Sequence, residues 1–254
     1  MLVAVDIGNS NVVIGLHDGE EWRYLWRIPT ITDGDINFYK LKIANLWVET
    51  GIPPTDISQV IVSSVVPELT ESVIAFCLDM FSCAVREVGP QLYQDLNFEI
   101  QRPHEIGSDL VANAFAARML FPDSNAVVVD FGTALTFVAV GINNTIHGVS
   151  IAPGIQTALR SLNIQTARLP EVPLDFPDRV GGKDTVHAIQ SGVLIGYEGL
   201  IAHMLTRYRA EFDPTLITLA TGGLATQLPD LHRHFDHVLP TLTLDGLRFI
   251  ALSV

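Results

Sequence analysis

The sequence predicts an α/β protein made of two similar domains that face one another across a central cleft. A short pattern occurs twice, as VAVDIG at 3–8 and as VVVDFG at 127–132, about half of the chain apart. Each copy opens three short apolar runs joined by polar turns, and helices alternate with strands beyond them. We therefore expect one domain at 1–115 and a second at 116–254.

The three opening strands of each domain follow from the apolar runs. In the first half, VVIGL and WRYLWRI follow VAVDIG, with the polar turn HDGE between the last two runs. In the second half, TFVAV and IHGVSIA follow VVVDFG, with INNT as the matching turn. Short β-rich runs bounded by such turns are typical of strands joined by hairpins.

The remaining segments alternate between the spacing of apolar residues that is typical of helices and the apolar runs that are typical of strands. In the first half we expect helices at 35–50, 67–82 and 106–120, a strand buried on both faces at 60–66 and a short strand at 84–88. Gly51 and Pro53 end the first of these helices, and Pro67 suits the start of the second. In the second half we expect helices at 155–163, 185–211 and 243–252, and a strand at 215–221.

Composition narrows the choice of partners. The chain has 254 residues, 48% of them hydrophobic, and a formal net charge of −13. An acidic protein binds nucleic acid and anionic membranes poorly, because binding to either requires a basic surface on the protein. Two cysteines, Cys77 and Cys83, are too few for a disulfide framework or a zinc site. There is no basic stretch before an apolar run at the start and no spanning run, so we expect a cytoplasmic protein.

The repeated acidic turns are the first candidate site. A single aspartate at a strand end often only accepts N–H groups of its own turn. Two in matching positions, Asp6 and Asp130, favour a ligand held between the domains. Glycine after each aspartate permits close approach of the backbone to phosphate oxygens, and Mg²⁺ would balance carboxylates against phosphates.

A third candidate is LATGGLA at 219–225, a strand that ends in Gly222 and Gly223. Taken alone it is an ordinary turn between a strand and a helix. Together with the two acidic turns it suggests a flat wall for the adenine or ribose of ATP. The three segments therefore predict an ATP site.

These residues carry a resemblance that runs nearly end to end. The sequence resembles the type III pantothenate kinases, of the superfamily of acetate and sugar kinases, Hsp70 and actin, whose domains are ribonuclease H-like (actin-like ATPase) folds. The matching segments are DIGNSN at 6–11, VSSVVP at 62–67, HEIGSDLVANA at 104–114, VVVDFGTALTF at 127–137, APGI at 152–155, ARLP at 167–170, GKDT at 182–185, QSG at 190–192 and TGG at 221–223.

The resemblance implies transfer of the γ-phosphoryl group of ATP to pantothenate, giving 4′-phosphopantothenate in the first step of coenzyme A synthesis. It implies Asp109 as the general base, Asp130 as the ligand of a monovalent cation (K⁺ or NH₄⁺), and Asp6 as the Mg²⁺ contact through the phosphates. The residues that we expect at ATP are Asp6, Ile7, Gly8, Asn9, Ser10, Asn11, Val12, Val13, Gly132, Thr133, Gly222 and Gly223. Those expected at pantothenate are Gly107, Ser108, Asp109, Leu110 and Thr185.

The residue types suit this chemistry. Phosphoryl transfer depends on positioning and charge neutralisation, and an alcohol needs a nearby carboxylate to accept its proton. Two of the residues also have simpler readings. Asp109 fits an acidic residue in the first turn of a helix, and Thr185, after Asp184, fits a helix cap.

The chain departs from the family pattern near the acceptor. Leu110 stands where the family has arginine, and leucine can neither orient a substrate by charge nor neutralise one. Leu135 and His147 replace a threonine and a glycine. Either the pocket is rebuilt, with Arg102 or a basic residue of a partner subunit supplying the charge, or the chain is impaired or acts on another small alcohol or acid. A related protein with a binding or regulatory role is the remaining alternative, since members of this family are also described as accessory factors for gene expression.

The resemblance also implies a homodimer. The predicted helix that carries Asp109 is unusually small and apolar at 111–116. Such a face suits burial either against a second copy or against the chain's own sheet.

Overall fold

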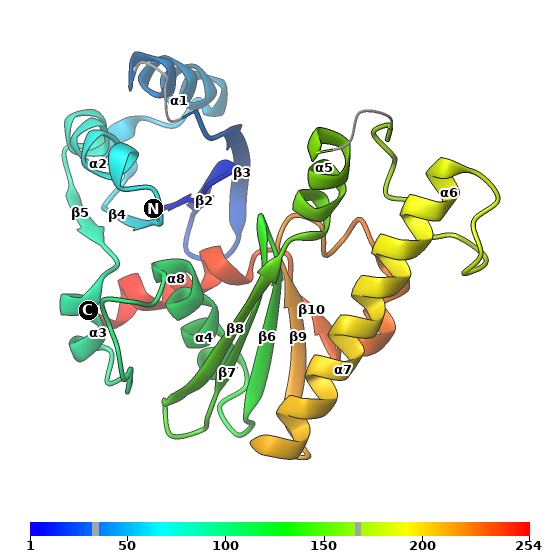
Figure 1. Cartoon of the computed structure of the whole chain (residues 1–254). Helices are drawn as coiled ribbons and strands as arrows, with labels where there is room; N and C mark the ends of the chain where they lie inside the picture. Colours follow the sequence, from blue (N-terminus) through cyan, green and yellow to red (C-terminus); the bar gives the residue numbers. More distant parts are fainter. Residues whose placement is uncertain (32–35, 166–168) are drawn as a thin grey trace. The chain divides into compact units, whose positions relative to one another are not determined.

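The computed structural model describes residues 1–31, 36–165 and 169–254. They form two compact units, Met1–Ala116 with Thr243–Val254, and Ala117–Leu242. Each unit contains a five-stranded sheet with helices around it, which confirms the predicted α/β class (Figure 1). The division at 115 and 116 stays a prediction about domains; in the structure the helix that follows the second unit packs with the first.

The sheet of the first unit has the order β3-β2-β1-β4-β5. Strand β1 pairs antiparallel with β2 and parallel with β4, so the carboxyl ends of β1 and β4 lie at the same edge of the sheet. The strands are β1 (Leu2–Ile7), β2 (Asn11–His17), β3 (Trp22–Pro29), β4 (Gln59–Ser64) and β5 (Ala84–Glu87). The helices are α1 (Ile36–Thr50), α2 (Pro67–Phe81), α3 (Pro90–Asp95), α4 (Ser108–Leu120) and α8 (Leu242–Ser253), of which α4 continues into the second unit.

The sheet of the second unit has the order β10-β9-β6-β7-β8, with β6 antiparallel to β7 and parallel to β9. The strands are β6 (Ala126–Phe131), β7 (Ala134–Val140), β8 (Ile146–Pro153), β9 (Ile217–Thr221) and β10 (His237–Val238). The helices are α5 (Ile155–Gln165), α6 (Thr185–Gln190) and α7 (Gly196–Glu211). The helix expected at 185–211 contains Gly192, Gly196 and Gly199, which could allow a close contact or mark a break; the structure has a π-helical turn there, Ser191–Ile195. Neither β10 nor α3 was expected, because two and six residues are too short to show a periodic pattern.

The central strands explain why the sequence showed continuous apolar runs. In β1 and in β6 every residue is buried except the aspartate one place before the strand's last residue. Strands covered on both faces have this pattern. Asp6 and Asp130 are therefore the charged residues of otherwise apolar strands.

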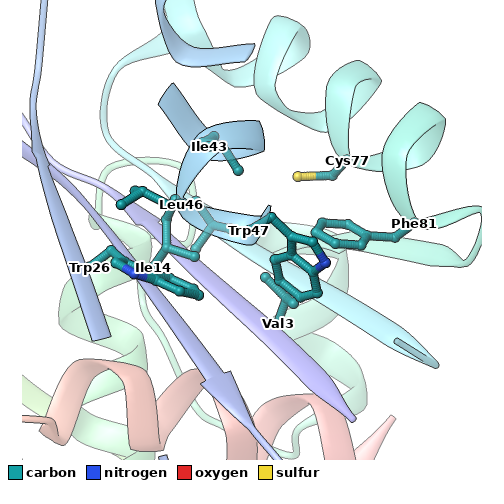
Figure 2. Close-up of a pocket in the computed structure, with 9 residues that line it drawn as sticks. Val3, Ile14, Trp26, Ile43, Leu46, Trp47, Cys77 and Phe81 are labelled. Carbon is teal, nitrogen blue, oxygen red and sulfur yellow. The ribbon is translucent and has the colours of Figure 1, made fainter. Parts of the chain in front are cut away.

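The core of the first unit leaves a small cavity between the sheet and helices α1 and α2 (Figure 2). Its volume is about 10 Å³, roughly that of one water molecule. Its lining is apolar throughout: Val3, Val5, Ile14, Trp26, Ile43, Leu46, Trp47, Cys77 and Phe81. A space of this size and character is a packing defect of the core, not a substrate site.

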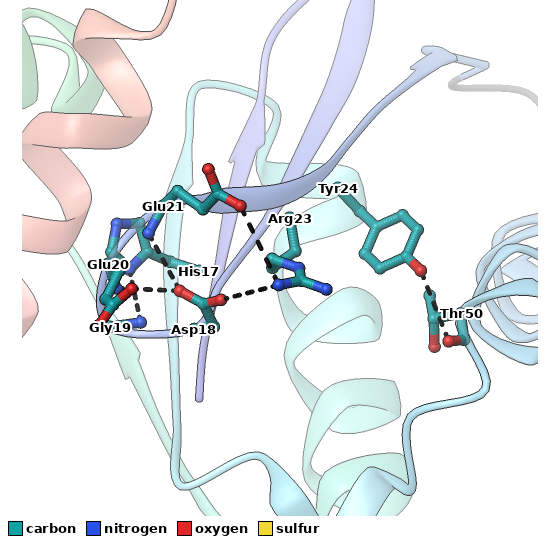
Figure 3. A network of polar contacts seen from close by, with 8 residues as sticks. All are labelled: His17, Asp18, Gly19, Glu20, Glu21, Arg23, Tyr24 and Thr50. Carbon is teal, nitrogen blue, oxygen red and sulfur yellow. Dashed lines mark hydrogen bonds and ion pairs between the residues drawn. The ribbon is translucent and has the colours of Figure 1, made fainter.

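The turn between β2 and β3 contains an aspartate, Asp18, whose surroundings differ from those expected at the candidate site (Figure 3). The carboxylate of Asp18 accepts the N–H groups of Glu21 at 3.0 Å and Glu20 at 2.9 Å, and Arg23 lies 3.5 Å away. These amides lower the pKa of Asp18. This carboxylate is therefore satisfied by its own turn.

Helix α8 fits closely against the first unit. A Cβ atom at Gly246 would lie 2.0 Å from the carbonyl oxygen of Ala112 in α4, so only glycine allows this approach. The hydroxyl of Thr243 donates to Asn113 at 2.9 Å, and the indole of Trp22 donates to Asp245 at 2.8 Å. The small apolar stretch of α4 that was considered for a dimer is buried within the chain: Val111, Ala112, Ala114, Phe115 and Ala116. These five residues are therefore not available to a second copy, and the homodimer stays a prediction.

Within the described parts of the chain, no helix combines the length and the apolar character that crossing a membrane would require. Both thiols are free, with Cys77 buried and Cys83 partly exposed. Burial raises the pKa of Cys77 to about 12, so this thiol is not reactive at neutral pH.

Candidate functional site

The first acidic turn begins at the end of β1. Asp6 lies opposite Ser63 of β4, whose hydroxyl donates to the Asp6 carboxylate at 2.9 Å. The turn itself is closed by the N–H of Gly8, which donates to the carbonyl of Asn11 at 2.9 Å. Thr30 at the end of β3 adds a hydroxyl bond of 2.6 Å to the carbonyl of Gly8. The turn is thus held in one shape before any ligand binds.

The expected ATP residues of this turn fall into two groups. Asn9 and Ser10 are exposed and offer side-chain donors to solvent. Ile7 and Val12 are completely buried in the core, so only their backbone groups can face a ligand. Val13 lies opposite Asp6 on β2.

Two serines connect this turn to the predicted general base. The hydroxyl of Ser108, the first residue of α4, lies 2.9 Å from the hydroxyl of Ser63. It also accepts the N–H of Ser64 at 3.1 Å. A chain of hydroxyls therefore runs from Asp6 to the helix start that carries Asp109. Sequence reasoning missed Ser63 and Ser64 as site residues, although a pair of serines inside an apolar strand was the available signal.

Asp109 is half-buried in the first turn of α4 and accepts the N–H of Leu110 at 2.8 Å. Burial raises the pKa of its carboxyl, and the N–H groups of Leu110 and of Asp109 itself partly oppose this shift. The negative charge of Asp109 acts on Tyr93 of α3. Burial is the main cause that raises the pKa of Tyr93 to about 12, and the charge of Asp109 adds to it. Tyr93 is a neighbour of the base that the sequence did not reveal, because an aromatic residue in a short helix looks like core.

Gly107 is required by the position of this carboxylate. A Cβ atom there would lie 2.4 Å from Oδ1 of Asp109. Any other residue would push the carboxylate away from its bond to Leu110. The glycine expected at pantothenate thus has a definite role in placing the base.

The structure also describes Leu110, where the sequence departs from the family pattern, and Arg102. The side chain of Leu110 is buried, 6% exposed. Arg102, suggested as a replacement for the missing charge, is 76% exposed and pairs with Glu105 at 3.0 Å. Exposed pairs of this kind add little stability, so Arg102 is not strongly fixed. Its role at the acceptor stays a hypothesis.

The second acidic turn, at the end of β6, is built in the same way. Gly132 donates its N–H to the carbonyl of Ala134 at 3.1 Å. The carbonyl of Thr133 accepts the N–H of Gly154 at 2.9 Å and the hydroxyl of Thr157 at 2.7 Å. Gly132 and Thr133 are both exposed, so the turn is ordered by its neighbours and open on its outer side.

The two-glycine segment lies beside Asp130. Gly222 has a φ of +95°, and a Cβ atom there would lie 2.3 Å from Oδ1 of Asp130. Gly223 follows, and its carbonyl accepts the side-chain amide of Gln227 at 2.9 Å. Thr221, opposite Asp130 on β9, is fully buried, and within the described residues its hydroxyl oxygen has no hydrogen-bond partner. The predicted Gly222 and Asp130 are therefore in contact range, and Thr221 is an addition.

Thr185 is exposed at the first position of α6. The cap of this helix is Asp184, whose carboxylate accepts the N–H of His187 at 2.8 Å. The hydroxyl of Thr185 is thus not needed as the cap. Of the ARLP segment at 167–170, Ala167 and Arg168 lie outside the described residues.

The donor sets agree with ATP chemistry in one respect. Among residues 1–31, 36–165 and 169–254, no three His, Cys, Asp or Glu side chains gather as they would in a protein-only metal cage. Each acidic turn supplies one carboxylate, and Mg²⁺ is usually held by one or two carboxylates together with phosphates. At Asp130 a second oxygen, from Thr221, is buried without a partner and fits a cation ligand.

Comparisons with known proteins agree with these features. The sequence model of the family described as type III pantothenate kinase matches residues 2–207. The type III pantothenate kinase of Dehalococcoides mccartyi (strain ATCC BAA-2266 / KCTC 15142 / 195) is 36% identical over 249 residues, 98% of this chain and 96% of that protein. That of Acidiphilium cryptum (strain JF-5) is 36% identical over 252 residues, 99% of this chain and 94% of that protein.

Solved structures of low identity share the fold. A protein of Campylobacter jejuni, titled a conserved putative Baf family transcriptional activator, superposes with a TM-score of 0.58 at 20% identity, covering 98% of this chain and 96% of that one. The ethanolamine utilization protein EutJ of Carboxydothermus hydrogenoformans gives 0.56 at 17% identity, covering 98% and 89%. The ROK hexokinase of Thermus thermophilus gives 0.52 at 12% identity, covering 99% and 98%. The expected actin-like ATPase fold is confirmed.

Proposed function

The chain belongs to the type III pantothenate kinase family, and from this premise we propose that it transfers the γ-phosphoryl group of ATP to the primary hydroxyl of pantothenate. One observation of the structure supports this most directly. The hydroxyls of Ser63 and Ser108 connect the acidic turn at Asp6 to the start of helix α4, where Asp109 is the next residue and its carboxylate is half-buried. A base and a phosphate turn so linked suit phosphoryl transfer to an alcohol.

Asp109 acts as the general base. Its carboxylate accepts the proton of the substrate hydroxyl as the bond to phosphorus forms. Burial raises its pKa, which makes it a stronger proton acceptor than an exposed aspartate, while the N–H of Leu110 fixes its orientation. Gly107 leaves room for this orientation.

We expect residues of both turns to contribute to nucleotide binding. In the first unit, the backbone from Asp6 to Val13 would bind phosphate oxygens, together with Asn9 and Ser10, whose side chains are exposed. In the second unit, Gly132 and Thr133 would bind phosphate oxygens, and Gly222 with Gly223 would contact the nucleoside. When bound, Mg²⁺ near Asp6 and a monovalent cation at Asp130 neutralise charge on the phosphates.

The acceptor side carries a second candidate function. The expected pantothenate residues are Gly107, Ser108, Leu110 and Thr185. The buried Leu110 provides an apolar surface where the family has a guanidinium. This observation favours a substrate-shifted or catalytically weak kinase, acting on a small alcohol with less negative charge than pantothenate, or keeping only a binding role.

We also propose that the protein acts in the cytoplasm as a homodimer. The basis is the family, whose substrates are soluble metabolites. Light scattering at micromolar concentration tests the association. A monomer would contradict the proposed dimer without affecting the kinase assignment.

ADP production with and without pantothenate tests the function. We expect ADP release that requires both Mg²⁺ and pantothenate and that is faster in K⁺ than in Na⁺. A panel of small alcohols and hydroxy acids, measured in the same assay, separates the two candidates. No turnover with pantothenate but turnover with an uncharged alcohol would favour the second candidate; ATP binding without any turnover would favour the binding role.

A further inference from the structure

The two acidic turns offer an internal comparison. In each sheet the aspartate of the central strand lies opposite a hydroxyl residue on the neighbouring parallel strand, Ser63 for Asp6 and Thr221 for Asp130. Paired residues on adjacent strands point to the same face of a sheet, so each hydroxyl lies beside its carboxylate. Figure 1 shows the second of these pairs of strands, β6 with β9.

The two pairs are bonded differently. Ser63 donates directly to Asp6 at 2.9 Å and also contacts Ser108. The hydroxyl of Thr221 is fully buried and, among the described residues, makes no hydrogen bond. Buried polar groups without a partner destabilise a fold, and a bound ion or an ordered water is a common explanation for one.

The backbone after Thr221 also favours a ligand at this point. Gly222 adopts a φ of +95° and brings its backbone against Oδ1 of Asp130, where a Cβ atom would be only 2.3 Å away. The carboxylate oxygen and the Thr221 hydroxyl oxygen are therefore both at the end of the same strand pair. Neutral and anionic oxygens are the ligands that hard cations select.

We propose that the hydroxyl oxygen of Thr221 is a ligand of the monovalent cation that Asp130 binds. The cation site is then shared by the ends of β6 and β9, whereas the Asp6–Ser63 pair is closed by its own hydrogen bond and takes no such cation. The proposal rests on the proposed function, which assigns a monovalent cation to Asp130. It adds the residue that completes the site.

Thermal unfolding without pantothenate tests this inference. The melting temperature is measured in KCl and in N-methylglucamine chloride of equal ionic strength, with and without Mg·ADP. We expect potassium to raise the melting temperature of the unmodified protein. In Thr221→Val the apparent potassium affinity should fall about tenfold, as expected for one lost polar interaction. In potassium-free buffer this variant should be at least as stable as the unmodified protein, because it buries no unpaired hydroxyl.

Three controls separate the site from general effects. Thr221→Ser keeps the hydroxyl and should keep the potassium response. Ser63→Ala removes the equivalent hydroxyl of the first unit and should also keep it. Asp130→Asn should abolish it. If Thr221→Val does not fold, Thr221→Ala is compared with Thr221→Ser in its place.

Three results would overturn the proposal. They are an unchanged potassium response in Thr221→Val, no potassium response in the unmodified protein with or without Mg·ADP, and an equal loss of stability in both buffers. Because the readout needs no acceptor, it is independent of the kinase assay. A potassium response that depends on Thr221 in a protein that does not phosphorylate pantothenate would sustain the site and refute the proposed substrate.

Discussion

Strands β1 and β6 are the central strands of two sheets that have the same arrangement of neighbouring strands. Both sheets place an antiparallel hairpin pair on one side of the central strand and a parallel strand on the other. The burial patterns of β1 and β6 are identical, as are those of β2 and β7. Each second strand also carries an irregularity at the same place, Leu16/His17 and Ala139/Val140.

The copies differ where the strands end. The first turn joins paired residues Ile7 and Val12, and the second joins Phe131 and Leu135, so the second turn is one residue shorter. The hydroxyl beside the first aspartate is bonded to it, and the hydroxyl beside the second is not. The apolar framework has been kept while the polar ends have diverged, which is where a fold carries its function.

The largest expected difference between the units follows from the proposal that Asp109, in the first unit, is the general base. Asp109→Asn should lower kcat by about 10²–10⁴, because general-base catalysis contributes that much. It should not lower stability at neutral pH. Since burial raises the folded pKa of this carboxyl, the folded state loses stability as pH rises through that pKa, and the ionised group is a cost above it. Steady-state rates and thermal unfolding measure both effects, with the exposed Asp95→Asn as the control. A parallel fall of rate and melting temperature would contradict a catalytic role.

The two aspartates themselves should respond differently. Asp6→Asn should reduce phosphoryl transfer about 100-fold, because a neutral amide holds the Mg²⁺ beside the phosphates poorly. Asp130→Asn should instead remove the difference between K⁺ and Na⁺. Rates measured across both cations, with circular dichroism to confirm folding, test the pair. Equal loss of potassium dependence in both variants would contradict the assignment of the monovalent cation to Asp130.

Two glycines beside the acidic residues should also differ, here in their effect on stability: Gly222, which follows β9 and lies beside Asp130, and Gly8, which follows Asp6 in the first turn. Gly222→Ala meets a positive φ and a carboxylate oxygen at 2.3 Å, so it should cost about 2–4 kcal/mol. Gly8→Ala meets only the carbonyl of Asn11 at 3.2 Å and should cost under about 1 kcal/mol. Chemical denaturation of both variants measures the difference. Equal costs would show that the backbone beside Asp130 is no more constrained than the first turn.

The raised pKa of Asp109 should also make the activity depend on pH, which is a smaller effect than those of the substitutions above. Activity should fall as pH decreases through this pKa, because the base is then protonated, and the midpoint should lie above that of an ordinary aspartate. The pH profile of kcat/KM measures it. A midpoint at or below the ordinary value would show that the carboxylate is better solvated than the structure indicates.

The smallest effect is expected at Arg102. Its side chain is exposed and paired with Glu105, so Arg102→Ala should change KM for pantothenate less than about twofold. Leu110→Arg, at the buried position where the family has arginine, should lower KM for pantothenate if the missing charge limits binding. A large rise in KM for Arg102→Ala would show instead that this residue has taken over the role.

Much of this arrangement could be predicted from the sequence. The repeat of VAVDIG predicted both central strands, because the spacing of apolar residues is a local property of the sequence. The resemblance predicted Asp109 as the general base, and this role stays a prediction. The serine link from Asp6 to Asp109 was not predictable, since it depends on the register between β1 and β4 and on where α4 begins. Nor was the state of Thr221, because hydrogen bonding of a buried hydroxyl is decided by tertiary neighbours.

The packing of α8 has a consequence for how the protein forms during synthesis. The second unit is one continuous stretch, while the first is made of two pieces that lie on either side of it in the chain. A ribosome therefore delivers all of the second unit before it delivers the helix whose Gly246 fits against Ala112 and whose Asp245 holds Trp22. Domains generally fold in the order in which they are synthesised. Here the unit that starts first is the one completed last, so a growing chain carries an uncovered α4 until its final helix emerges.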